Sequence, residues 1–424
     1  MRIWNYEETD LSLLLMRTME DNQLGPVVAE IIAKVAKEGD QALKDFAARF
    51  DHAELTDLEV SREEIQKARE AVGPALLRVM ERAAENIRAF HSKQVREGFT
   101  WKKEDGMILG QKVTPIEKVG LYVPGGTASY PSTVLMNAIP AKIAGCEEIV
   151  MVSPPTCNGS IAAPILAAAS VAGVNRIFKV GGAQAVAALA YGTETIPKVD
   201  KIVGPGNAYV AEAKRQVFGR VNIDMIAGPS EILVVADEDN DPAYLAADLL
   251  SQAEHDKLAT AVLVTDSRSL AEAVSAEVEK QLQVLPREEI ARASIETNGK
   301  IIITRSLDQA IEAANALAPE HLEICVKDPM ACLPKIRNAG SVFLGKYCPE
   351  AVGDYLGGPN HTLPTSGTAR FSSPLSVDDF VKKTQFSYLT EEALAGLAED
   401  IAVFARAEGL EGHARSALIR GKKA

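Results

Sequence analysis

Cysteine is scarce in this sequence, and its spacing argues against two kinds of cysteine-based structure. The chain has five cysteines, an odd number, and no two are spaced as CxxC. A disulfide framework and a zinc site built from thiolates are therefore not expected. Cys146 and Cys325 stand in apolar surroundings, which predicts that both are core residues.

Long apolar runs and an excess of basic residues are also absent. No run of about 18 uncharged apolar residues occurs, so no transmembrane helix is expected. The opening residues, MRIWNYEETDLSLL, lack the apolar run of a signal peptide. A formal net charge of −13 argues against a general nucleic-acid binder. These absences predict a cytoplasmic protein that contacts neither nucleic acid nor membrane.

The periodicity of the apolar residues changes near residue 110. Before that point they recur at three- and four-residue steps, which is typical of helices. After it, short apolar strands alternate with helices, as in a parallel α/β sheet, and the alternation repeats after residue 230. Beyond residue 375 the chain is predicted to be polar and helical. That tail is too small for a core of its own, so we expect it to dock on another surface.

Two glycine-rich segments connect a predicted strand to a predicted helix. They are VGGAQAVAALAYG at residues 180–192 and VGPGNAYVAEAK at residues 203–214. Glycines permit a tight turn, and the helix N-terminus that follows attracts anions. Neither segment matches GxGxxG, and no GK[ST] loop occurs. Each alone is typical of an ordinary strand-to-helix turn, whereas several in one unit favour a nucleotide cofactor.

The segment APEHLE, residues 318–323, places a glutamate and a histidine side by side after a predicted helix. Histidine titrates near neutrality, and the adjacent carboxylate offers a second base. Glu320 and His321 are therefore candidates for acid–base catalysis. The alternative is a histidine at a helix end that interacts with the helix dipole.

A further helix is predicted to begin at Asp241, its N-cap, with proline in the first turn. Leucines and alanines form one apolar stripe, and Asp248, Gln252 and His255 lie on the opposite face. Such a face is usually solvated. With other oxygen or imidazole ligands nearby it would suit zinc or a related divalent ion. The candidates for these further ligands stand far away in the sequence: Asp354, His361 and His413.

Seven segments of this chain occur in a characteristic order over nearly its whole length: GLYVPGG, GPGNAYVAEAKRQV, GPSE, DLLSQAEH, APEHLE, VGDYLGGPNHTLPT and EGHARS. Together they resemble the histidinol dehydrogenase family. The match is specific because seven segments agree in order, although any one alone is weak. The resemblance implies oxidation of L-histidinol through its aldehyde to L-histidine by two hydride transfers to NAD. These are the last two steps of histidine biosynthesis.

The resemblance also implies the roles of the polar residues. One zinc ion per subunit is expected, and it would act mainly as a template that holds the substrate. His321 is expected to be the base of the alcohol step, and Glu320 to activate water in the hydration of the aldehyde. A neutral imidazole suits the first role, because the hydroxyl proton must leave when hydride is removed. The implied zinc ligands are Gln252, His255, Asp354 and His413.

Further contacts follow from the same match of motifs. Ser230 and Glu408 are expected to contact the substrate, in addition to His321 and the metal ligands. In the family's homodimer, His413 and Glu408 would reach the site of the partner subunit. The implied NAD contacts are Tyr122, Gln184 and Asn207.

Two residues keep open roles. His361 either orients Asp354 or contacts the substrate. Asp248 either supports the metal ligands from behind or is a solvated residue, and the two alternatives are equally weighted.

The implied fold is α/β, with two incomplete Rossmann-like parallel-sheet domains, a helical N-terminal segment and a C-terminal dimerisation tail. Residues 26–108 and 232–372 are expected to form the domain with the metal and catalytic residues. Residues 109–231 are expected to bind NAD. Residues 1–25 and 373–424 would form an arm and a tail with dimer contacts. An incomplete Rossmann-like unit would explain glycine-rich loops that lack the dinucleotide fingerprint.

Two rival interpretations of the sequence stand beside this one. The first is a related dehydrogenase that oxidises a different small alcohol, and the segment VGDYLGGPNHTLPT argues against it. The second is a non-catalytic protein that binds a metal or a nucleotide. The presence of Glu320 and His321 with all four implied ligands argues against that loss of catalysis.

Overall fold

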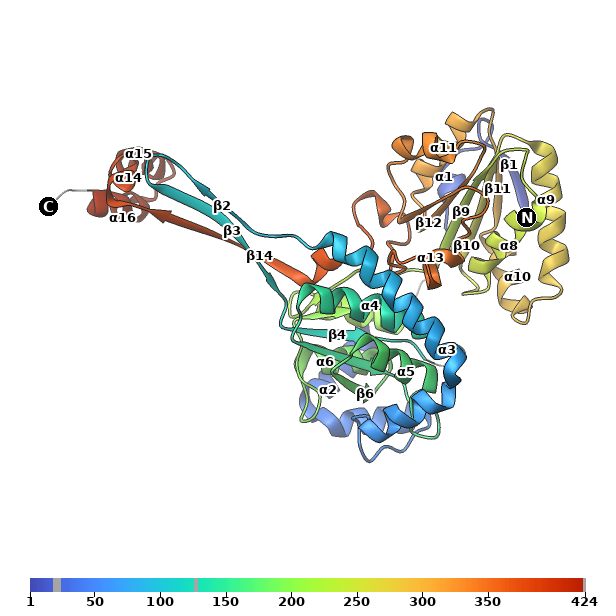
Figure 1. Cartoon of the computed structure of the whole chain (residues 1–424), viewed down its shortest axis with the longest axis horizontal. Helices are drawn as coiled ribbons and strands as arrows, with labels where there is room; N and C mark the ends of the chain where they lie inside the picture. The colour runs from blue at the N-terminus through green and yellow to red at the C-terminus, as the bar shows by residue number, and fades with distance from the viewer. Residues whose placement is uncertain (18–23, 126–128, 422–424) are drawn as a thin grey trace. The chain divides into compact units, whose positions relative to one another are not determined.

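A computed structural model describes residues 1–17, 24–125 and 129–421. The chain divides into two compact units (Figure 1). The first contains Met1–Gln94 and Glu117–Phe380, and the second contains Val95–Ile116 and Val381–Ala424. The predicted arm and tail include residues 18–23 and 422–424, which lie outside the described residues. In the part of the chain that is described, every helix is too short or too polar to span a membrane.

A six-stranded parallel sheet in the first unit carries the catalytic candidates. Both faces of the sheet are covered by helices, so alternate residues of its inner strand β9 belong to two separate cores. Ile232 and Val234 share a core with α8 (Pro242–Ala253), α9 (Arg268–Leu282) and α10 (Glu288–Thr297). Leu233 and Val235 share the other core with α1 (Leu11–Leu15) and α11 (Leu307–Leu317). The strand order is β1 (Arg2–Asn5), β11 (Lys300–Ile303), β10 (Thr260–Thr265), β9 (Glu231–Ala236), β12 (His321–Cys325) and β13 (Ser341–Leu344).

A five-stranded parallel sheet in the same unit carries the cofactor candidates. Its order is β6 (Arg176–Lys179), β5 (Glu148–Ser153), β4 (Lys118–Tyr122), β7 (Lys201–Val203) and β8 (Asn222–Ile223). The connecting helices are α4 (Pro131–Ala144), α5 (Ala163–Ala172), α6 (Gly182–Tyr191) and α7 (Ala208–Val217). Helix α2 (Gly25–Phe46) packs on α6 and α7, and α3 (Arg62–His91) packs on α4 and α5. These two covered sheets confirm the predicted α/β class with Rossmann-like domains.

The helix α2 shares its core with this five-stranded sheet. Its residues Val28 and Val35 belong to the same buried cluster as Val150 of β5 and Val186 of α6. The domain boundaries stay a prediction, and the packing adds that α2 is part of the core around β5.

Apart from the edge strand β1, each parallel sheet is built outward in both directions from an inner strand, β4 in one sheet and β9 in the other. The chain runs from β4 to β5 and β6, and then returns to β7 and β8 on the other side of β4. It likewise runs from β9 to β10 and β11, and then returns to β12 and β13. The strand order therefore reverses between β4 and β7 and between β9 and β12. Such switch points are where open α/β sheets bind ligands.

Short helices complete the first unit. They are η1 (Ala47–Asp51), η2 (Ser92–Gln94), α12 (Pro329–Cys332), η3 (Leu333–Lys335), α13 (Ala351–Tyr355), η4 (Thr368–Arg370) and η5 (Val377–Phe380).

The second unit is a three-stranded antiparallel sheet with three helices. The order is β14 (Val381–Leu389), β3 (Met107–Pro115) and β2 (Phe99–Lys102). The helices are α14 (Glu391–Ala395), α15 (Ala398–Ala407) and α16 (Glu411–Gly421), with a small alanine core. The expectation of a helical tail beyond residue 375 is wrong over β14. Its segment KKTQ is polar, and its pairing partner β3 lies far away in the sequence, so the local pattern did not indicate a strand.

Two predictions about single buried residues can be compared with the fold. Cys146 and Cys325 are buried, as predicted. His91, the last residue of α3, is fully buried, although the helical periodicity of this segment gives no reason to expect a buried histidine there. Its Nδ1 atom lies 2.7 Å from Oε1 of Gln94, and the same oxygen accepts a hydrogen bond from the backbone N–H of Val377. The end of α3 is therefore covered by a segment that follows it by more than 280 residues in sequence.

Candidate active site

Glu320 and His321 stand at the start of β12, beside the start of β9. Helix α11 ends at Leu317, and Ala318 has a left-handed backbone (φ 49°) that ends the helix. The backbone N–H of Glu231 donates to Oε2 of Glu320 (2.9 Å), and Nδ1 of His321 lies 2.9 Å from the Glu231 carbonyl oxygen. Because a carbonyl can only accept, we assign the imidazole proton to Nδ1. The buried Nε2 atom, which has no hydrogen-bond partner among the described residues, is then available as a base.

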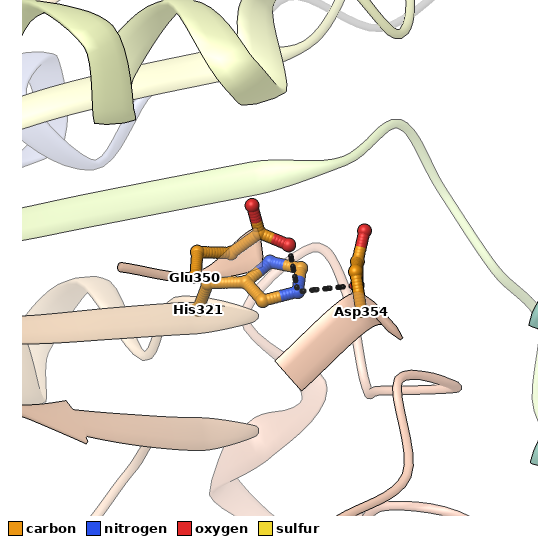
Figure 2. A group of neighbouring side chains, drawn as sticks. All are labelled: His321, Glu350 and Asp354. Carbon is orange, nitrogen blue, oxygen red and sulfur yellow. Dashed lines mark ion pairs between the residues drawn. The ribbon is translucent and has the colours of Figure 1, made fainter. Parts of the chain in front are cut away.

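Two carboxyl groups from a later segment lie beside this nitrogen. Oε1 of Glu350 is 3.7 Å and Oδ1 of Asp354 is 4.0 Å from Nε2 of His321. Figure 2 shows both carboxyl groups next to the same ring nitrogen. The two acids are four residues apart at α13, a spacing that places them on one side of a helix. Ligand-capable atoms of these three residues all lie within 4.8 Å of one another. Nδ1 of His361 is 3.6 Å from Oδ1 of Asp354.

Burial controls protonation in this cluster. It raises the pKa of Glu320 well above its usual range. It also raises the pKa of Asp354 to about 9, together with the negative charge of Glu350 and a hydrogen bond between the two carboxyl groups. Burial lowers the pKa of His321, and it lowers the pKa of His361 to about 4. His321 therefore meets its neighbours as a neutral imidazole, so its contacts are not ion pairs. Carboxyl groups with raised pKa values are poised to release protons when a cation binds.

Gln252 and His255 lie at the C-terminal end of α8. Gln252 is fully buried, and neither polar atom of its amide has a hydrogen-bond partner among the described residues. Nδ1 of His255 is 3.4 Å from the hydroxyl oxygen of Ser230. A buried amide without partners costs about 1–3 kcal/mol, and a ligand would remove that cost. A solvated face is therefore wrong for Gln252, and its side chain fits a ligand for a metal or a substrate.

A relay of hydrogen bonds connects α8 to Glu350. The Ser251 hydroxyl donates to Oε2 of Glu350 (3.2 Å), and the backbone N–H of Glu350 donates to Oε1 of Glu323 (2.7 Å). The side chain of Asp248 hydrogen-bonds to Glu323. Burial raises the pKa of Glu323, and it raises the pKa of Asp248 to about 6. Asp248 is half-buried, and its contact leads to Glu350 by way of Glu323.

Glu323 and Glu350 were not predicted to belong to this cluster. Glu323 has a detectable signal, because a glutamate inside the apolar strand HLEICV must find a buried partner. Glu350 stands one helical turn before Asp354, a spacing that could have paired the two acids.

The remaining substrate candidates lie in different units. Ser230 immediately precedes β9 and lies beside His255. Glu408 follows α15 and His413 lies in α16, and both are exposed on the second unit. The roles of Glu408 and His413 stay predictions.

The expected NAD contacts lie around the carboxyl ends of β4 and β7. Tyr122 ends β4, and its buried hydroxyl accepts a hydrogen bond from the backbone N–H of Gly182 (3.0 Å). Gln184, two residues later on α6, is also buried. Gly204 follows β7 with φ +111°, and a Cβ there would lie 2.1 Å from the Tyr122 carbonyl oxygen. Asn207 caps α7 with its side chain. The three candidates surround the switch point between β4 and β7.

A buried ion pair fixes the loop that leads to Asn207. Nζ of Lys214 contacts Oδ1 of Asp224 and donates to the Gly204 carbonyl oxygen (3.0 Å). The backbone N–H of Gly204 donates to Oδ2 of Asp224 (2.7 Å). The two charged side chains are only 3% and 1% exposed, so they form part of the core beneath the loop.

Comparison with known proteins shows the family of this chain. The family model described as histidinol dehydrogenase matches residues 15–421. The chain is 56% identical over 411 residues to a histidinol dehydrogenase of Geobacillus kaustophilus, which covers 96% of this chain and 97% of the relative. It is also 56% identical over 396 residues to the histidinol dehydrogenase of Bacillus subtilis, which covers 93% of each chain. A crystal structure of histidinol dehydrogenase from Elizabethkingia anophelis superposes with a TM-score of 0.95 and 39% identity, over 99% of this chain and 98% of the other.

Proposed function

The chain belongs to the histidinol dehydrogenase family, and from that premise we propose that it oxidises L-histidinol through L-histidinal to L-histidine with two NAD⁺. The reaction would complete histidine biosynthesis. The observation that carries this proposal is His321, a buried neutral imidazole whose Nε2 atom has no hydrogen-bond partner among the described residues. A cytoplasmic location stays a prediction.

Nε2 of His321 would accept the hydroxyl proton in the alcohol step. A hydride then leaves the carbinol carbon for the nicotinamide of NAD⁺, which gives the aldehyde, NADH and a proton. The hydrogen bond of Nδ1 to the Glu231 carbonyl holds the imidazole in the required tautomer. A base in this position contributes on the order of 10²–10⁴-fold to the rate.

Glu320 would act in the hydration of the aldehyde. Its carboxylate would take a proton as water adds to the carbonyl carbon. A second hydride then leaves the hydrate for a second NAD⁺, which gives the carboxylic acid. This role requires the ionised form, although burial raises the pKa of Glu320. A bound divalent cation nearby would favour that ionised form.

The metal proposed at this site is zinc. Gln252, His255 and Asp354 would hold it together with His413 of a second subunit. The buried amide of Gln252, without protein partners, supports the ligand role, and the set offers the oxygen and imidazole donors that zinc accepts. A bound zinc would supply a template that orients the imidazole and amino group of the substrate.

A different donor set competes with this one. The grouping of His321, Glu350 and Asp354 within 4.8 Å could also hold a cation. We favour the set with Gln252, because ligation by His321 would occupy the nitrogen needed as a base. Metal content of purified variants separates the two. Glu350→Gln should keep the metal and Gln252→Ala should lose it, and the opposite result would favour the competing set.

Chelation provides a second test of the metal. No thiolate is among the proposed ligands, so a chelator should remove the ion while the α/β core stays folded. Binding of L-histidinol should fail and binding of NAD should survive. Unfolding of the chelated protein, followed by circular dichroism, would contradict a site that serves the substrate alone.

The NAD site is proposed at Tyr122, Gln184 and Asn207. Their position around a switch point of the five-stranded sheet supports it. Calorimetric titration with NAD should give a weaker affinity for Asn207→Ala than for the wild type. An unchanged affinity would remove Asn207 from the site.

A homodimer in which Glu408 and His413 complete the partner's site is also proposed. Support comes from the second unit, where the single chain leaves large apolar side chains exposed. Exposed apolar patches of this kind mark contact with another protein. They include Phe99, Trp101, Phe386, Tyr388, Val403, Phe404 and Ile419.

The decisive experiment is the stoichiometry of complete turnover. Purified protein should form two NADH for each L-histidinol consumed and should release L-histidine with little free aldehyde. Other small amino alcohols, tested in parallel, should be poor substrates. One NADH with accumulating aldehyde would contradict the four-electron reaction. Preference for another alcohol would favour a related dehydrogenase, and no NADH at all would favour a non-catalytic protein.

A further inference from the structure

The two catalytic candidates share one anchor, the first residue of β9. Glu231 binds Glu320 through its backbone N–H and His321 through its carbonyl oxygen. A shift of this one residue would therefore disturb both candidates. Its own side chain, 4% exposed, has no role in the proposed reaction.

Arg17, from the N-terminal segment, holds that side chain. Its Nη2 atom donates to Oε2 of Glu231 (3.1 Å), and its Nε atom lies beside Oε1. The same Nη2 atom donates to the carbonyl oxygen of Leu317 (2.7 Å), the last residue of α11. The guanidinium therefore joins β9 to the helix end that leads into Glu320. The backbone N–H of Ser366 completes the cage by donating to Oε1 of Glu231 (3.1 Å).

The charges explain why an arginine suits this position. Burial raises the pKa of Glu231, and Arg17 opposes that rise. Glu231 stands next to a second buried carboxyl group, that of Glu320. A planar guanidinium matches a carboxylate with two donors in a fixed geometry. Without Arg17, the buried Glu231 carboxylate would lose its hydrogen-bonded cation and keep only the electrostatic attraction of Lys300, so it would take up a proton or move.

We propose that Arg17 is a positioning residue that acts through Glu231 to hold Glu320 and His321 in their reactive arrangement. The kinetic part of this inference rests on the proposed function. The structural part, the arrangement of the His321 ring, does not.

Other contacts hold the N-terminal segment in place independently of Arg17. Leu14 is buried in the core of the six-stranded sheet. Nζ of Lys300 donates to the carbonyl oxygen of Leu14 (3.1 Å) and also contacts that of Met16. Replacement of the guanidinium should therefore leave the segment attached, which makes the variant informative.

The first test is steady-state kinetics of Arg17→Met. We expect kcat to fall about 10- to 100-fold, the scale seen when a supporting partner of a reactive group is removed. The KM values for L-histidinol and NAD should stay within about twofold. Arg305→Met is the matched control, because the Arg305–Glu7 ion pair also involves the N-terminal segment but is 72% and 54% exposed. The control should leave kcat unchanged.

Two further measurements separate positioning from loss of stability. Glu231→Gln should also lower kcat, and the double variant should be no slower than the slower single variant, because both changes break one connection. Methylguanidine should restore part of the activity of Arg17→Ala with saturation. A multiplicative effect in the double variant, or a normal kcat in Arg17→Met, would overturn the inference.

A measurement without substrate keeps the inference testable if L-histidinol is not oxidised. Nitrogen-15 NMR of the His321 ring should show the Nδ1–H tautomer in the wild type and a changed tautomer ratio or line width in Arg17→Met. An identical His321 spectrum in both proteins would overturn the proposal even if the wild-type protein is active. An inactive wild type with a changed spectrum would refute the proposed function alone.

Discussion

At the scale of single residues, His321 and Glu320 differ in how well their surroundings suit the protonation state that each needs as a base. His321 has one ring nitrogen held by a carbonyl oxygen and the other without a hydrogen-bond partner among the described residues. Glu320 accepts a hydrogen bond from the backbone N–H of Glu231, and the nearby acidic side chains of Glu231, Asp354 and Glu350 add to the effect of burial in raising its pKa. The surroundings of His321 thus favour a neutral base directly. Glu320 can act as a carboxylate base only when a nearby positive charge stabilises its ionised form.

This difference predicts separate effects on the two half-reactions. Glu320→Gln should slow oxidation of L-histidinal more than oxidation of L-histidinol, because only the aldehyde needs hydration. His321→Ala should slow both by on the order of 100-fold or more, the usual scale for loss of a general base. Each half-reaction can be followed by NADH formation from its own substrate. His52→Ala, at an exposed histidine, is the control. Equal and mild effects on both half-reactions would contradict the division of roles.

The burial of Asp51 predicts a pH-dependent effect on the stability of the protein, at a position away from the catalytic candidates. Its Oδ2 atom is buried without a hydrogen-bond partner among the described residues, and burial raises the pKa of Asp51 from 3.8 to about 6. The folded state then holds the proton more tightly than the unfolded state. The stability that this proton confers is complete below about pH 4 and is lost as the pH rises through about 6.

Asp51→Asn should therefore stabilise the protein at pH 7 and lose that advantage near pH 4. We expect about 1 kcal/mol, less than the pKa shift alone implies, because the side chain is partly solvated. Thermal midpoints at the two pH values provide the measurement. Asp57→Asn, at an exposed position nearby, should change neither value. A stabilisation that is the same at both pH values would reject this account.

The residues of the candidate site were predictable to different degrees. Helical spacing grouped Gln252 with His255, and adjacency made Glu320 and His321 candidates, but only the family resemblance implied their roles in a metal and catalytic site. The contact of Glu350 with His321 joins segments 29 residues apart (350 − 321) across β13, and no local periodicity encodes it. Arg17 is 214 residues from Glu231 in the sequence, so no local sequence pattern predicts their ion pair.

At the scale of the secondary-structure elements, the two sheets present their sites at opposite ends. The expected NAD contacts lie at or beyond the carboxyl ends of β4 (Tyr122), β6 (Gln184) and β7 (Asn207), as the general rule for α/β sheets predicts. Glu320 and His321 instead stand at the amino end of β12, and Ser230 stands at the amino end of β9. The C-terminal end of α8 lies at the same end of the six-stranded sheet, because His255, which follows this helix, contacts Ser230.

The loop between β7 and α7 predicts a specific effect on the cofactor. Lys214→Met would leave Asp224 buried without its partner, a change that typically costs about 3–5 kcal/mol. The Gly204 loop should lose its shape, and the dissociation constant for NAD should rise at least about tenfold while L-histidinol binding changes little. Calorimetric titration with each ligand measures both effects. Lys257→Met, which removes an exposed ion pair, is the control. Equal weakening of both ligands would indicate general damage rather than a loop effect.

The elements of the α/β sheets were the most predictable part of the fold. Their strands are covered on both faces, so each is a short apolar run between helices. Strands β1, β2, β3 and β14 were missed, the first three of them in or next to the part of the chain before residue 110 that was expected to be helical. Strand β1 gains its place only by pairing with β11, and Ile3 is the partner of Ile301. Strand β14 is exposed along most of its length, and its segment KKTQ is polar on both faces, so its sequence lacks the pattern of a half-buried strand.

At the scale of the whole molecule, His413 decides how many chains one active site needs. If it completes the partner's site, a mixture of His255→Ala and His413→Ala proteins should recover activity after subunit exchange. One site of each mixed dimer would collect both changes and the other would collect neither. Statistical exchange in a two-fold dimer should restore about a quarter of wild-type activity. NADH formation measures it, and native mass spectrometry counts the mixed dimers. Mixed dimers without activity would show that His413 serves its own chain.

The second unit has a consequence for protein synthesis, because its sheet combines two distant parts of the chain. Strand β3 ends at Pro115 and its neighbour β14 begins at Val381, so 266 residues separate them (381 − 115). At about 5–20 residues per second, the ribosome needs roughly 13 to 53 seconds to make that stretch. During this interval the edge of β3 that later pairs with β14 has no partner, and the neighbouring strand β2 exposes Phe99 and Trp101. We expect nascent chains stalled at residue 380 to be cut by protease between residues 95 and 116, and released full-length chains to resist. Equal resistance would mean that the hairpin is protected before its partner strand exists.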